Sequence, residues 1–575
     1  MCGIAGHYGS SDTGEVLLDM LKRLEYRGYD STGAAFLSGS DISTVKGTGD
    51  IEKIKENVVF LGSVADGGIG HTRWATHGRA SDENAHPHSS CENRFSLVHN
   101  GIIENHRKIK SELGGHKFYS ETDSEVAVHY IEEKSTLGVE NAVVSFMEKA
   151  KGSYAVALMD SKEERVFLLK NGSPLAIGIG KKDVFIASDP FAFHSYTDRV
   201  LFLRDGEYAV VDNCDVTIKN LDGAVQKRKP EVLEWKERSF GKNGYRHYMQ
   251  KEIREIPGCI ERLEKLLETV ESEKVDGFID ALLGKDKVVL TASGTSHHAS
   301  MLGSRFLRKV GVDARVVVAS EFGENFEIDE ETLLLAVSQS GETKDVLDAI
   351  ETARKMGADI ASITNTPHST IQRRSDVNLG IHAGREFCVA ATKTFTNQVY
   401  TLRKISKRIR GRSSVGNLPS NLKNTIKKNG EAVKKVAEEL KNKEDIYILG
   451  KGEMHPVAEE ISLKLKEIAY IHAEGMMGGE LKHGTLALIE EGTPVISLVP
   501  RRNSDIVSNL KEVKSRGANS IEISPFSDRF ELPDEDEDFI FFSAVLGFML
   551  TYWIGRKKGL PVDRPRNLAK SVTVR

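Results

Sequence analysis

From Lys287 onward the chain alternates short apolar runs, glycine-containing turns and longer amphipathic segments, and this rhythm constrains the fold more than any other feature. KVVLTASGTS (287–296) leads into HHASMLGSRFLRKVG (297–311), and TLLLAVSQSGET (332–343) leads into KDVLDAIETARKMG (344–357). Short strands that alternate with longer helices are typical of a parallel α/β sheet. About 160 residues after Lys287, IYILGKGEM (446–454) and HPVAEEISLKLKEIA (455–469) repeat the pattern. We therefore predict an internal duplication of one α/β unit.

The part of the chain before this region has a different pattern. At 575 residues the chain is too long for one hydrophobic core, and domains of about 100–200 residues imply about three. Residues up to about 215 are rich in glycine and in strand-like runs such as GSYAVALM (152–159) and RVFLL (165–169). These runs predict a layered domain with much β-structure. The polar, poorly periodic residues 220–245 are interpreted as a linker.

Composition narrows the class of protein. The chain carries 79 basic and 84 acidic residues, and this balance gives no reason to expect nucleic acid as a partner. Its five cysteines are scattered without a CxxC pair, which suits a reducing cytosol. The N-terminus lacks a basic stretch followed by an apolar one, so no secretory signal is expected.

One apolar run has the length of a short membrane span. Residues 539–555, FIFFSAVLGFMLTYWIG, contain no charged side chain, and 17 residues is the lower limit for crossing a bilayer. Acidic residues precede the run and basic residues follow it, as the dipole of a helix in a water-soluble protein favours. We predict a buried core helix and no membrane association.

Two loops in the α/β region have the composition of a phosphate site. SGTS (293–296) and SQSGET (338–343) each lie where a predicted strand ends and a helix begins, and open parallel sheets bind ligands at that edge. Hydroxyls and free backbone N–H groups at a helix start bind phosphate, although one such loop alone could be an ordinary helix cap. Neither a Walker lysine nor a GxGxxG pattern accompanies them. A phosphorylated sugar or another small phosphate ester fits better than a nucleotide.

The N-terminal part contains polar clusters of another kind. The chain begins MCGIAG, and Cys2 is either there by chance or becomes a first residue with a thiol and a free α-amine once Met1 is removed. Arg73 and Asp123 are suited to grip the carboxylate and ammonium of a free amino acid. Asn100 and Gly101 can offer a side-chain amide and a backbone N–H to an oxyanion.

Histidines gather in the same part of the sequence. They stand at positions 71, 77, 86, 88 and 99, which raises the question of a zinc site. No HxxxH or CxxC spacing occurs among them, and the cysteines do not cluster with them. We therefore predict no metal site and no cofactor.

Taken in order, these motifs resemble a known enzyme family. MCGIAG, RLEYRGYDS, HTRWATHG, HNGIIEN and SETD resemble the class II glutamine amidotransferase domain, an N-terminal-nucleophile hydrolase. SGTS, SQSGET, AATK, KLKEIAYIHAE, GELKHG and PRNLAKSVTV resemble paired sugar-isomerase (SIS) domains. The ordered set covers essentially the whole chain and resembles the glutamine–fructose-6-phosphate aminotransferases. It implies a four-layer αββα domain followed by two doubly wound parallel-sheet domains.

The resemblance implies a role for each matching residue. Cys2 is expected to attack the amide of glutamine with its own α-amine as base, and an amine with a pKa near 8 suits that task. In the sugar site, Glu467 matches the base that moves a proton between C1 and C2, His483 the ring-opening residue and Lys570 the Schiff-base lysine, while Lys464 precedes Glu467 by one helical turn. The remaining matches are Asn100 and Gly101 for the oxyanion; Arg73, Thr76, His77 and Asp123 for glutamine; Trp74 as a gate on an ammonia path; and Thr295, Ser296, Ser338, Gln339, Ser340, Thr343, Val389, Ala390 and Lys464 for the sugar phosphate.

The resemblance also implies an organisation. The expected division is a glutaminase domain at 2–218, a linker at 219–246, SIS domains at 247–425 and 426–565, and a tail at 566–575 over the sugar site. It implies a cytoplasmic homodimer that makes glucosamine 6-phosphate, the entry to amino-sugar biosynthesis.

Without the resemblance, these sugar-site residues would be interpreted differently. A Lys and a Glu three residues apart, such as Lys464 and Glu467, are usually an exposed helix pair, and a lone histidine such as His483 is usually a surface or capping group.

Two rival functions remain. A phosphoribosylamine-forming amidotransferase would share the first 215 residues but needs a different second fold. A binding-only regulator of phosphosugar metabolism would have no use for Glu467, His483 and Lys570 together.

Overall fold

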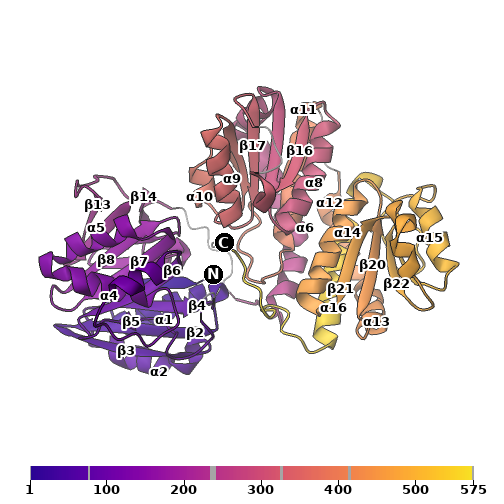
Figure 1. Cartoon of the computed structure of the whole chain (residues 1–575). Coiled ribbons are helices and arrows are strands. Elements are labelled where there is room, and N and C mark those ends of the chain that lie inside the picture. The colour runs from indigo at the N-terminus through magenta and orange to yellow at the C-terminus, as the bar shows by residue number, and fades with distance from the viewer. Residues whose placement is uncertain (1, 76–77, 234–240, 324–327, 412–415, 573–575) are drawn as a thin grey trace. The chain divides into compact units, whose positions relative to one another are not determined.

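The computed structural model describes residues 2–75, 78–233, 241–323, 328–411 and 416–572. By its internal contacts the chain divides into two compact units (Figure 1). The N-terminal unit comprises Met1–Glu237 with Ser571–Arg575, and the C-terminal unit comprises Arg238–Lys570.

The N-terminal unit contains two antiparallel sheets. The eight-stranded sheet has the order β14 (Glu231–Val232), β11 (Arg199–Phe202), β9 (Ala176–Ile179), β10 (Asp183–Ala187), β1 (Gly3–Gly9), β4 (Gly67–Arg73), β2 (Ser31–Ser38) and β3 (Asp41–Thr48). The six-stranded sheet has the order β13 (Asp215–Asn220), β12 (Glu207–Asp212), β8 (Arg165–Asn171), β7 (Gly152–Asp160), β6 (Phe95–Ile103) and β5 (His88–Ser89). Its helices are α1 (Thr13–Leu24), α2 (Lys55–Gly62), α3 (His106–Glu112), α4 (Glu125–Lys134) and α5 (Val139–Lys149).

Three hydrophobic cores stack these elements into four layers. Leu17 and Leu21 of α1 pack with Phe185 on the outer face of the eight-stranded sheet. The inner faces of the two sheets meet through side chains such as Ile4 and Val98. A third core joins the other face of the six-stranded sheet to α4 and α5. Central strands such as β1 and β6 contribute to two cores because successive side chains point to opposite faces. The expected αββα arrangement is confirmed.

Half of the expected linker belongs to the N-terminal unit. In place of an independent segment from residue 219, β13 continues to Asn220, and β14 pairs with the edge strand β11. Leu233 is buried beneath the sheet among the residues of the α1 core. This apolar anchor holds the polar residues before it against the domain, and the division between the units falls at Glu237.

The C-terminal unit contains two parallel sheets. The first has the order β16 (Ala314–Val318), β15 (Lys287–Ala292), β17 (Thr332–Ser338), β18 (Asp359–Thr364) and β19 (Val377–Gly380). The second has the order β21 (His472–Met477), β20 (Asp445–Gly450), β22 (Pro494–Leu498) and β23 (Asn519–Ile523). The helices are α6 (Tyr248–Glu268), α7 (Ser272–Leu283), α8 (Thr295–Arg308), α9 (Lys344–Lys355), α10 (Thr370–Arg373), α11 (Lys393–Ile409), α12 (Leu418–Lys428), α13 (Gly430–Leu440), α14 (Met454–Lys464), α15 (Ile506–Lys514) and α16 (Phe539–Lys557).

Both sheets have the same winding, in which the first strand in sequence lies between the second and the third. Val288 and Val289, consecutive residues of β15, point into separate cores on the two faces of the first sheet. Ile446 and Tyr447 of β20 do the same in the second sheet. The predicted duplication and the doubly wound topology are therefore confirmed. In such sheets the winding reverses between the first and third strands, and ligands bind there at the carboxyl ends.

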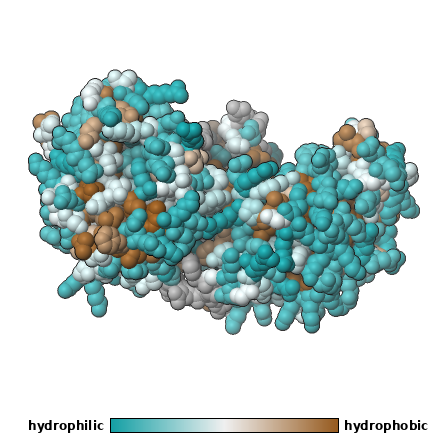
Figure 2. Space-filling model, turned by 90° about the horizontal axis from the view of Figure 1, so that it is seen from below, coloured by the Kyte–Doolittle hydropathy of each residue, from teal (hydrophilic) through white to brown (hydrophobic). Residues whose placement is uncertain are grey.

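The two parallel sheets share one core, through which the long apolar helix passes. Residues of α6, α11, α14 and α16 all contribute to it, so the expected boundary at residue 425 falls inside α12, which packs on both α6 and α16. The helical stretch 536–557 is long and apolar enough to span a membrane, but 94% of its most apolar window is buried in the fold. The prediction of a buried core helix is confirmed. The face in Figure 2 is mostly hydrophilic, with hydrophobic residues in small separate areas.

Candidate active sites

Cys2 lies at the start of β1, against the end of β4. Gly3 pairs with Thr72, so the thiol reaches the backbone of Trp74, accepting from its N–H at 3.2 Å and reaching its carbonyl at 3.4 Å. Burial raises the pKa of the Cys2 thiol, and the Trp74 N–H and the Arg73 guanidinium oppose that shift only in part. A thiol with a raised pKa is a weak nucleophile until a base removes its proton.

Asn100 and Gly101 on β6 lie beside Cys2. The Asn100 amide nitrogen donates to the Cys2 carbonyl at 3.1 Å. Gly101 has a φ of +130°, and a Cβ added there would lie 1.9 Å from the carbonyl oxygen of Ser153 on the paired strand β7. Only glycine fits this backbone, so the pair expected to bind an oxyanion is held by the sheet itself.

The sequence analysis gave no positioning role to His71. Its Nε2 lies 3.0 Å from the Asn100 side-chain oxygen and 2.9 Å from the His99 carbonyl. Both are acceptors, so this nitrogen carries the proton. Burial lowers the pKa of His71 to about 3, which keeps the ring neutral. It therefore fixes which end of the Asn100 amide faces Cys2.

Arg73 and Asp123, expected to hold glutamine, both lie in this region. Arg73 is buried and donates to the carbonyls of Gly78 and Arg79 at 3.2 and 3.3 Å. Burial lowers the pKa of Arg73, while the nearby charges of Cys2, Asp30 and Asp123 raise it. The Asp123 carboxylate accepts from the Ile103 N–H at 2.7 Å. Thr76 and His77, the other two expected glutamine ligands, lie outside the described residues.

Trp74 lies next to the Cys2 thiol in space, although the two residues are 72 positions apart in the sequence. Its ring meets that of Tyr29 edge to face at 5.4 Å, and its side chain is half-buried.

Three of the histidines that raised the question of zinc, His71, His86 and His88, form a buried group of neighbouring rings. The centroids of His71 and His86 lie 4.2 Å apart, and those of His86 and His88 lie 4.5 Å apart. Burial lowers the pKa of all three rings well below the ordinary value. These neutral imidazoles pack as core side chains.

In the C-terminal unit, both predicted phosphate loops lie where the winding of the first sheet reverses. SGTS follows β15 and SQSGET follows β17, and these strands are hydrogen-bonded neighbours. In the second loop the Ser338 hydroxyl accepts from the Gly341 N–H at 3.0 Å and lies 3.2 Å from the Thr343 hydroxyl. Gly341 has a φ of +68°, and a Cβ there would lie 2.0 Å from the Ser369 hydroxyl. The tight turn leaves Gln339 and Ser340 half-buried at its surface.

Thr295 of the first loop is part of a charged cluster on α14. Its hydroxyl accepts from the Lys464 ammonium at 2.9 Å and donates to the Glu460 carboxylate at 3.0 Å. Lys464 also contacts Glu467 at 2.6 Å, and the Lys464 and Glu460 side chains are fully buried. The carboxylates raise the pKa of Lys464 despite its burial. The cluster thus links residues from the two parallel sheets.

Glu460 and His298 were missed by the sequence analysis, although they complete this cluster. His298 Nδ1 lies 2.7 Å from the second oxygen of Glu460, and Gln398, also missed, donates to the Ser296 hydroxyl at 2.9 Å. Position 460 lies one helical turn before Lys464, so the i, i+4 spacing of two opposite charges was a signal that could have been read.

Glu467 is partly exposed, whereas the Lys464 and Glu460 side chains of the same cluster are fully buried. It lies in a π-helical turn, Leu465–Ala469, that follows α14, and its side chain is 20% exposed. Such turns displace side chains from the regular helical face and recur at functional sites. Tyr470 ends the turn in the left-handed conformation with a φ of 52°.

Lys570 lies against the first parallel sheet's loops. Its ammonium contacts the buried Glu386 at 2.6 Å, and Glu386 also accepts from the Thr392 N–H at 2.8 Å. Burial raises the pKa of Glu386, but Lys570 and that N–H outweigh it, and the net shift is downward. Burial and the charge of Glu386 raise the pKa of nearby Glu252 to about 8. Neither acid was singled out from the sequence.

The C-terminal region of the chain contacts both the Glu467 turn and the segment that contains Val389. The Arg566 N–H donates to the Tyr470 hydroxyl at 2.7 Å, so the tail passes the end of the Glu467 turn. The half-buried Val389 donates to the Asp563 carbonyl at 3.2 Å, and Ala390 beside it is buried. His483 is exposed at the end of a short 3₁₀ helix, and no hydrogen bond or ion pair joins it to another residue of the described ranges.

A pocket of about 340 Å³ adjoins the SGTS loop. Gly294, His298, Glu459 and Lys466 are among its lining residues. The expected sugar binders and Glu467 are not among its lining residues. We therefore do not identify this pocket with the sugar site.

Comparison with known proteins agrees with the two kinds of domain in the fold. A family model of the SIS domain matches residues 281–404 and 439–528, and one of the glutamine amidotransferase domain matches residues 71–195. Glutamine–fructose-6-phosphate aminotransferases (isomerising) from Thermococcus kodakarensis and Pyrococcus horikoshii are 41% and 40% identical to the chain, over the full length of both proteins. The solved C-terminal domain of glucosamine-fructose-6-phosphate aminotransferase from Francisella tularensis covers 57% of this chain and 100% of its own, with 29% identity and a TM-score of 0.51. The chain belongs to the glutamine–fructose-6-phosphate aminotransferase (isomerising) family.

Proposed function

We propose that the protein converts D-fructose 6-phosphate and L-glutamine into D-glucosamine 6-phosphate and L-glutamate. The observation that carries this proposal is that one chain holds two complementary sites. Asn100, followed by Gly101, contacts Cys2 in the N-terminal unit, and Glu467 is linked to the predicted phosphate loop of the C-terminal unit through Lys464 and Thr295. A nitrogen-releasing site and a phosphosugar site together fit this reaction.

In the glutaminase half-reaction, the thiol of Cys2 attacks the side-chain carbonyl carbon of glutamine. Its proton passes to the α-amine of Cys2, freed by loss of Met1, and from there to the departing ammonia. The Asn100 amide and the Gly101 N–H stabilise the oxyanion. Arg73 and Asp123 bind the two charged ends of the amino acid. Water then hydrolyses the thioester to release glutamate.

In the sugar half-reaction, the phosphate binds in the loops after β15 and β17. His483 assists ring opening, and the Lys570 amine forms an imine at C2 with loss of water. Ammonia then displaces Lys570, and Glu467 moves a proton between C1 and C2 to give the amino aldose. A carboxylate that is partly exposed and held at 2.6 Å by Lys464 is suited to that transfer.

The resemblance also supports proposals that concern the whole assembly. We infer a cytoplasmic homodimer in which the exposed His483 completes the sugar site of the neighbouring subunit. Trp74 is proposed to gate the passage of ammonia from Cys2. Ammonia is then the one chemical link between the two half-reactions.

The decisive assay supplies glutamine and fructose 6-phosphate to purified protein and measures glucosamine 6-phosphate and glutamate. We expect both products in equal amounts. Glutamate without amino sugar would leave only a glutaminase, and sugar binding without either product would favour a regulator. A second preparation with an uncleaved N-terminal tag tests the amine: glutamine hydrolysis should collapse although the thiol remains, and an unchanged rate would exclude the α-amine as base.

A further inference from the structure

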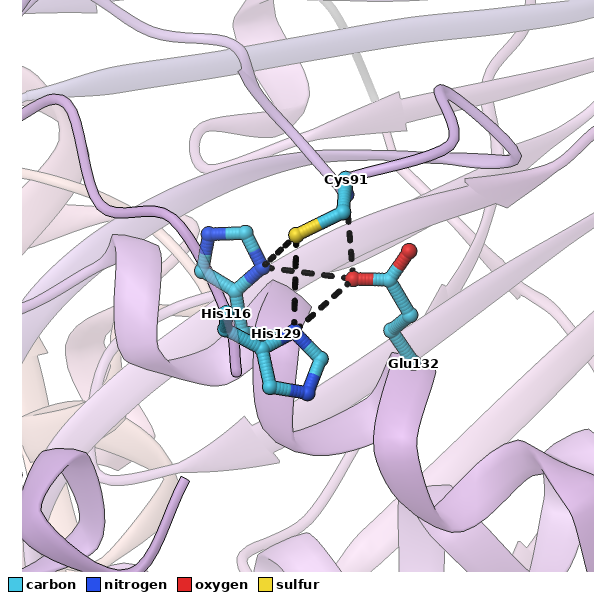
Figure 3. A group of neighbouring side chains, drawn as sticks. All are labelled: Cys91, His116, His129 and Glu132. Atoms are coloured by element: carbon cyan, nitrogen blue, oxygen red, sulfur yellow. Dashed lines mark hydrogen bonds and ion pairs between the residues drawn. The ribbon is translucent and has the colours of Figure 1, made fainter. Parts of the chain in front are cut away.

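A second group of reactive side chains lies in the N-terminal unit, outside the glutamine site. Cys91 stands in the turn between β5 and β6, His116 in the loop between α3 and α4, and His129 and Glu132 on α4. The four side chains turn toward one another (Figure 3), and their four potential ligand atoms all lie within 4.8 Å of one another. No step of the proposed reaction uses them.

Four of the six distances between the potential ligand atoms match the edges of a tetrahedron around zinc. The Cys91 sulfur lies 3.5 Å from His116 Nδ1 and 3.6 Å from His129 Nδ1. Glu132 Oε2 lies 3.2 and 3.3 Å from the same two nitrogens. Tetrahedral Zn²⁺, with bonds of about 2.3 Å to sulfur and about 2.05 Å to nitrogen or oxygen, sets sulfur–nitrogen edges of about 3.5 Å and nitrogen–oxygen edges of about 3.3 Å.

Hydrogen bonding alone explains this convergence poorly. A thiol has one proton, yet the Cys91 sulfur faces two imidazole nitrogens. Each of these nitrogens in turn faces both the sulfur and Glu132. One cation at the centre satisfies all four groups at once. A thiolate and a carboxylate also balance the two charges of Zn²⁺, so the site would be neutral.

The surroundings of the two histidines also fit a metal site. Nε2 of His129 lies 3.7 Å from Glu125, and Nε2 of His116 lies 3.5 Å from Glu133. Metal-bound histidines commonly direct their second nitrogen to a carboxylate, which orients the ring. The Cys91 N–H donates to Glu132 at 3.0 Å and fixes that ligand as well. His129 is buried, whereas Cys91 is exposed and offers the ion a path of entry.

We propose that Cys91, His116, His129 and Glu132 bind one structural Zn²⁺ ion. Four protein ligands close the coordination sphere, as in structural rather than catalytic zinc sites. Sulfur and imidazole donors select zinc over magnesium or calcium. The ion joins the β5–β6 turn to α4 and fixes both ends of the segment 116–129, in which Asp123 lies. This proposal departs from the sequence-based expectation of no metal and is independent of the proposed reaction.

The test measures zinc binding in the full-length chain, in a Cys2→Ala background so that the nucleophilic thiol does not bind the metal. The protein is stripped with a chelator and titrated with Zn²⁺, and bound zinc is measured by mass spectrometry. We expect one equivalent per chain and a rise of several degrees in the unfolding temperature of the N-terminal unit. Cys91→Ser and Glu132→Ala should lose both effects. Cys214→Ser is the matched control, because that half-buried thiol donates to backbone carbonyls and lies outside the four-residue cluster.

Cobalt provides a spectroscopic readout that a purely structural role of these residues would not produce. Co²⁺ added to the stripped protein should give the visible bands of tetrahedral cobalt and a thiolate charge-transfer band, which Cys91→Ser abolishes. Equal zinc binding by the parent and Cys91→Ser would overturn the proposal. So would the absence of stoichiometric zinc from the parent, and the four residues would then form a hydrogen-bonded ion-pair network only.

Discussion

The two candidate active sites are built by different physical means. Around Cys2, the groups expected to bind the oxyanion are placed by strand pairing and by a neutral histidine: the paired strand β7 leaves room only for glycine at position 101, and His71 orients Asn100. Around Glu467, the groups are held by buried opposite charges, with Lys464 between two carboxylates. An added atom is enough to disturb a site that is set by backbone geometry. In a site that is held by buried charges, removal of one charge leaves its partner buried and unpaired.

The largest expected effect separates the two sites completely. Cys2→Ala should reduce glutamine-dependent synthesis by more than about 10⁴-fold, because the nucleophile is lost, while interconversion of fructose 6-phosphate and glucose 6-phosphate continues. Glu467→Gln should do the converse and keep basal glutaminase activity, since an amide is not a proton-transfer base. Both activities are measured on each folded variant. Loss of isomerisation in Cys2→Ala would show that the sites are not separable.

The second effect tests the buried charges. Lys464→Met should lower the free energy of unfolding of the C-terminal unit by about 3–5 kcal/mol, because the fully buried Glu460 loses its cation. Calorimetry is expected to show a shift in that unit's transition and an unchanged glutaminase. Lys466→Met, at an exposed neighbouring position, is the control and should have little effect. An equally small effect of Lys464→Met would mean that the cluster stabilises nothing.

The third effect tests backbone geometry in the cysteine site. Gly101→Ala should cost about 10²–10³-fold in glutamine hydrolysis, which is the usual effect of losing an oxyanion donor, because its Cβ would lie 1.9 Å from the Ser153 oxygen. Gly39→Ala is a matched control, since Gly39 also has a positive φ but open space around it. Comparable losses in both variants would indicate general strain rather than displacement of the donor.

The smallest expected effect is a pH dependence of the free energy of unfolding of the N-terminal unit. The pKa of His71 is about 3 when folded and near 6.5 when unfolded, so only the unfolded state gains this proton as the pH falls below about 6.5. This one group should therefore lower the free energy of unfolding by about 1.5 kcal/mol between pH 6.5 and pH 5. Calorimetry across this range should show that the free energy of unfolding falls less steeply in His71→Gln than in the parent protein. Identical slopes in the two proteins would contradict the neutral His71.

Local patterns predicted much of this molecule. The alternation of strands, turns and helices predicted the doubly wound sheets, because the spacing of hydrophobic residues and the turn residues can both be recognised within short segments of sequence. The same alternation placed both predicted phosphate loops at one edge of the sheet, because the carboxyl ends of parallel strands lie at the same edge. The expected linker was too long because a single apolar residue, Leu233, anchors its first half, and one buried side chain leaves no periodic signal.

The sequence by itself determined the element types, the duplication, the family and the residues with reactive chemistry. Each of these can be read from residues that lie close together in the sequence. Tertiary structure alone decided which distant residues meet. His71 beside Asn100, Glu460 beside Thr295, Glu386 beside Lys570 and Cys91 beside His116 are separated by between 25 and 184 positions. Such pairs form because sheet pairing and core packing bring separate segments together, and their energies depend on burial. The residues next to a polar side chain in the sequence therefore show neither its partner nor whether it is buried.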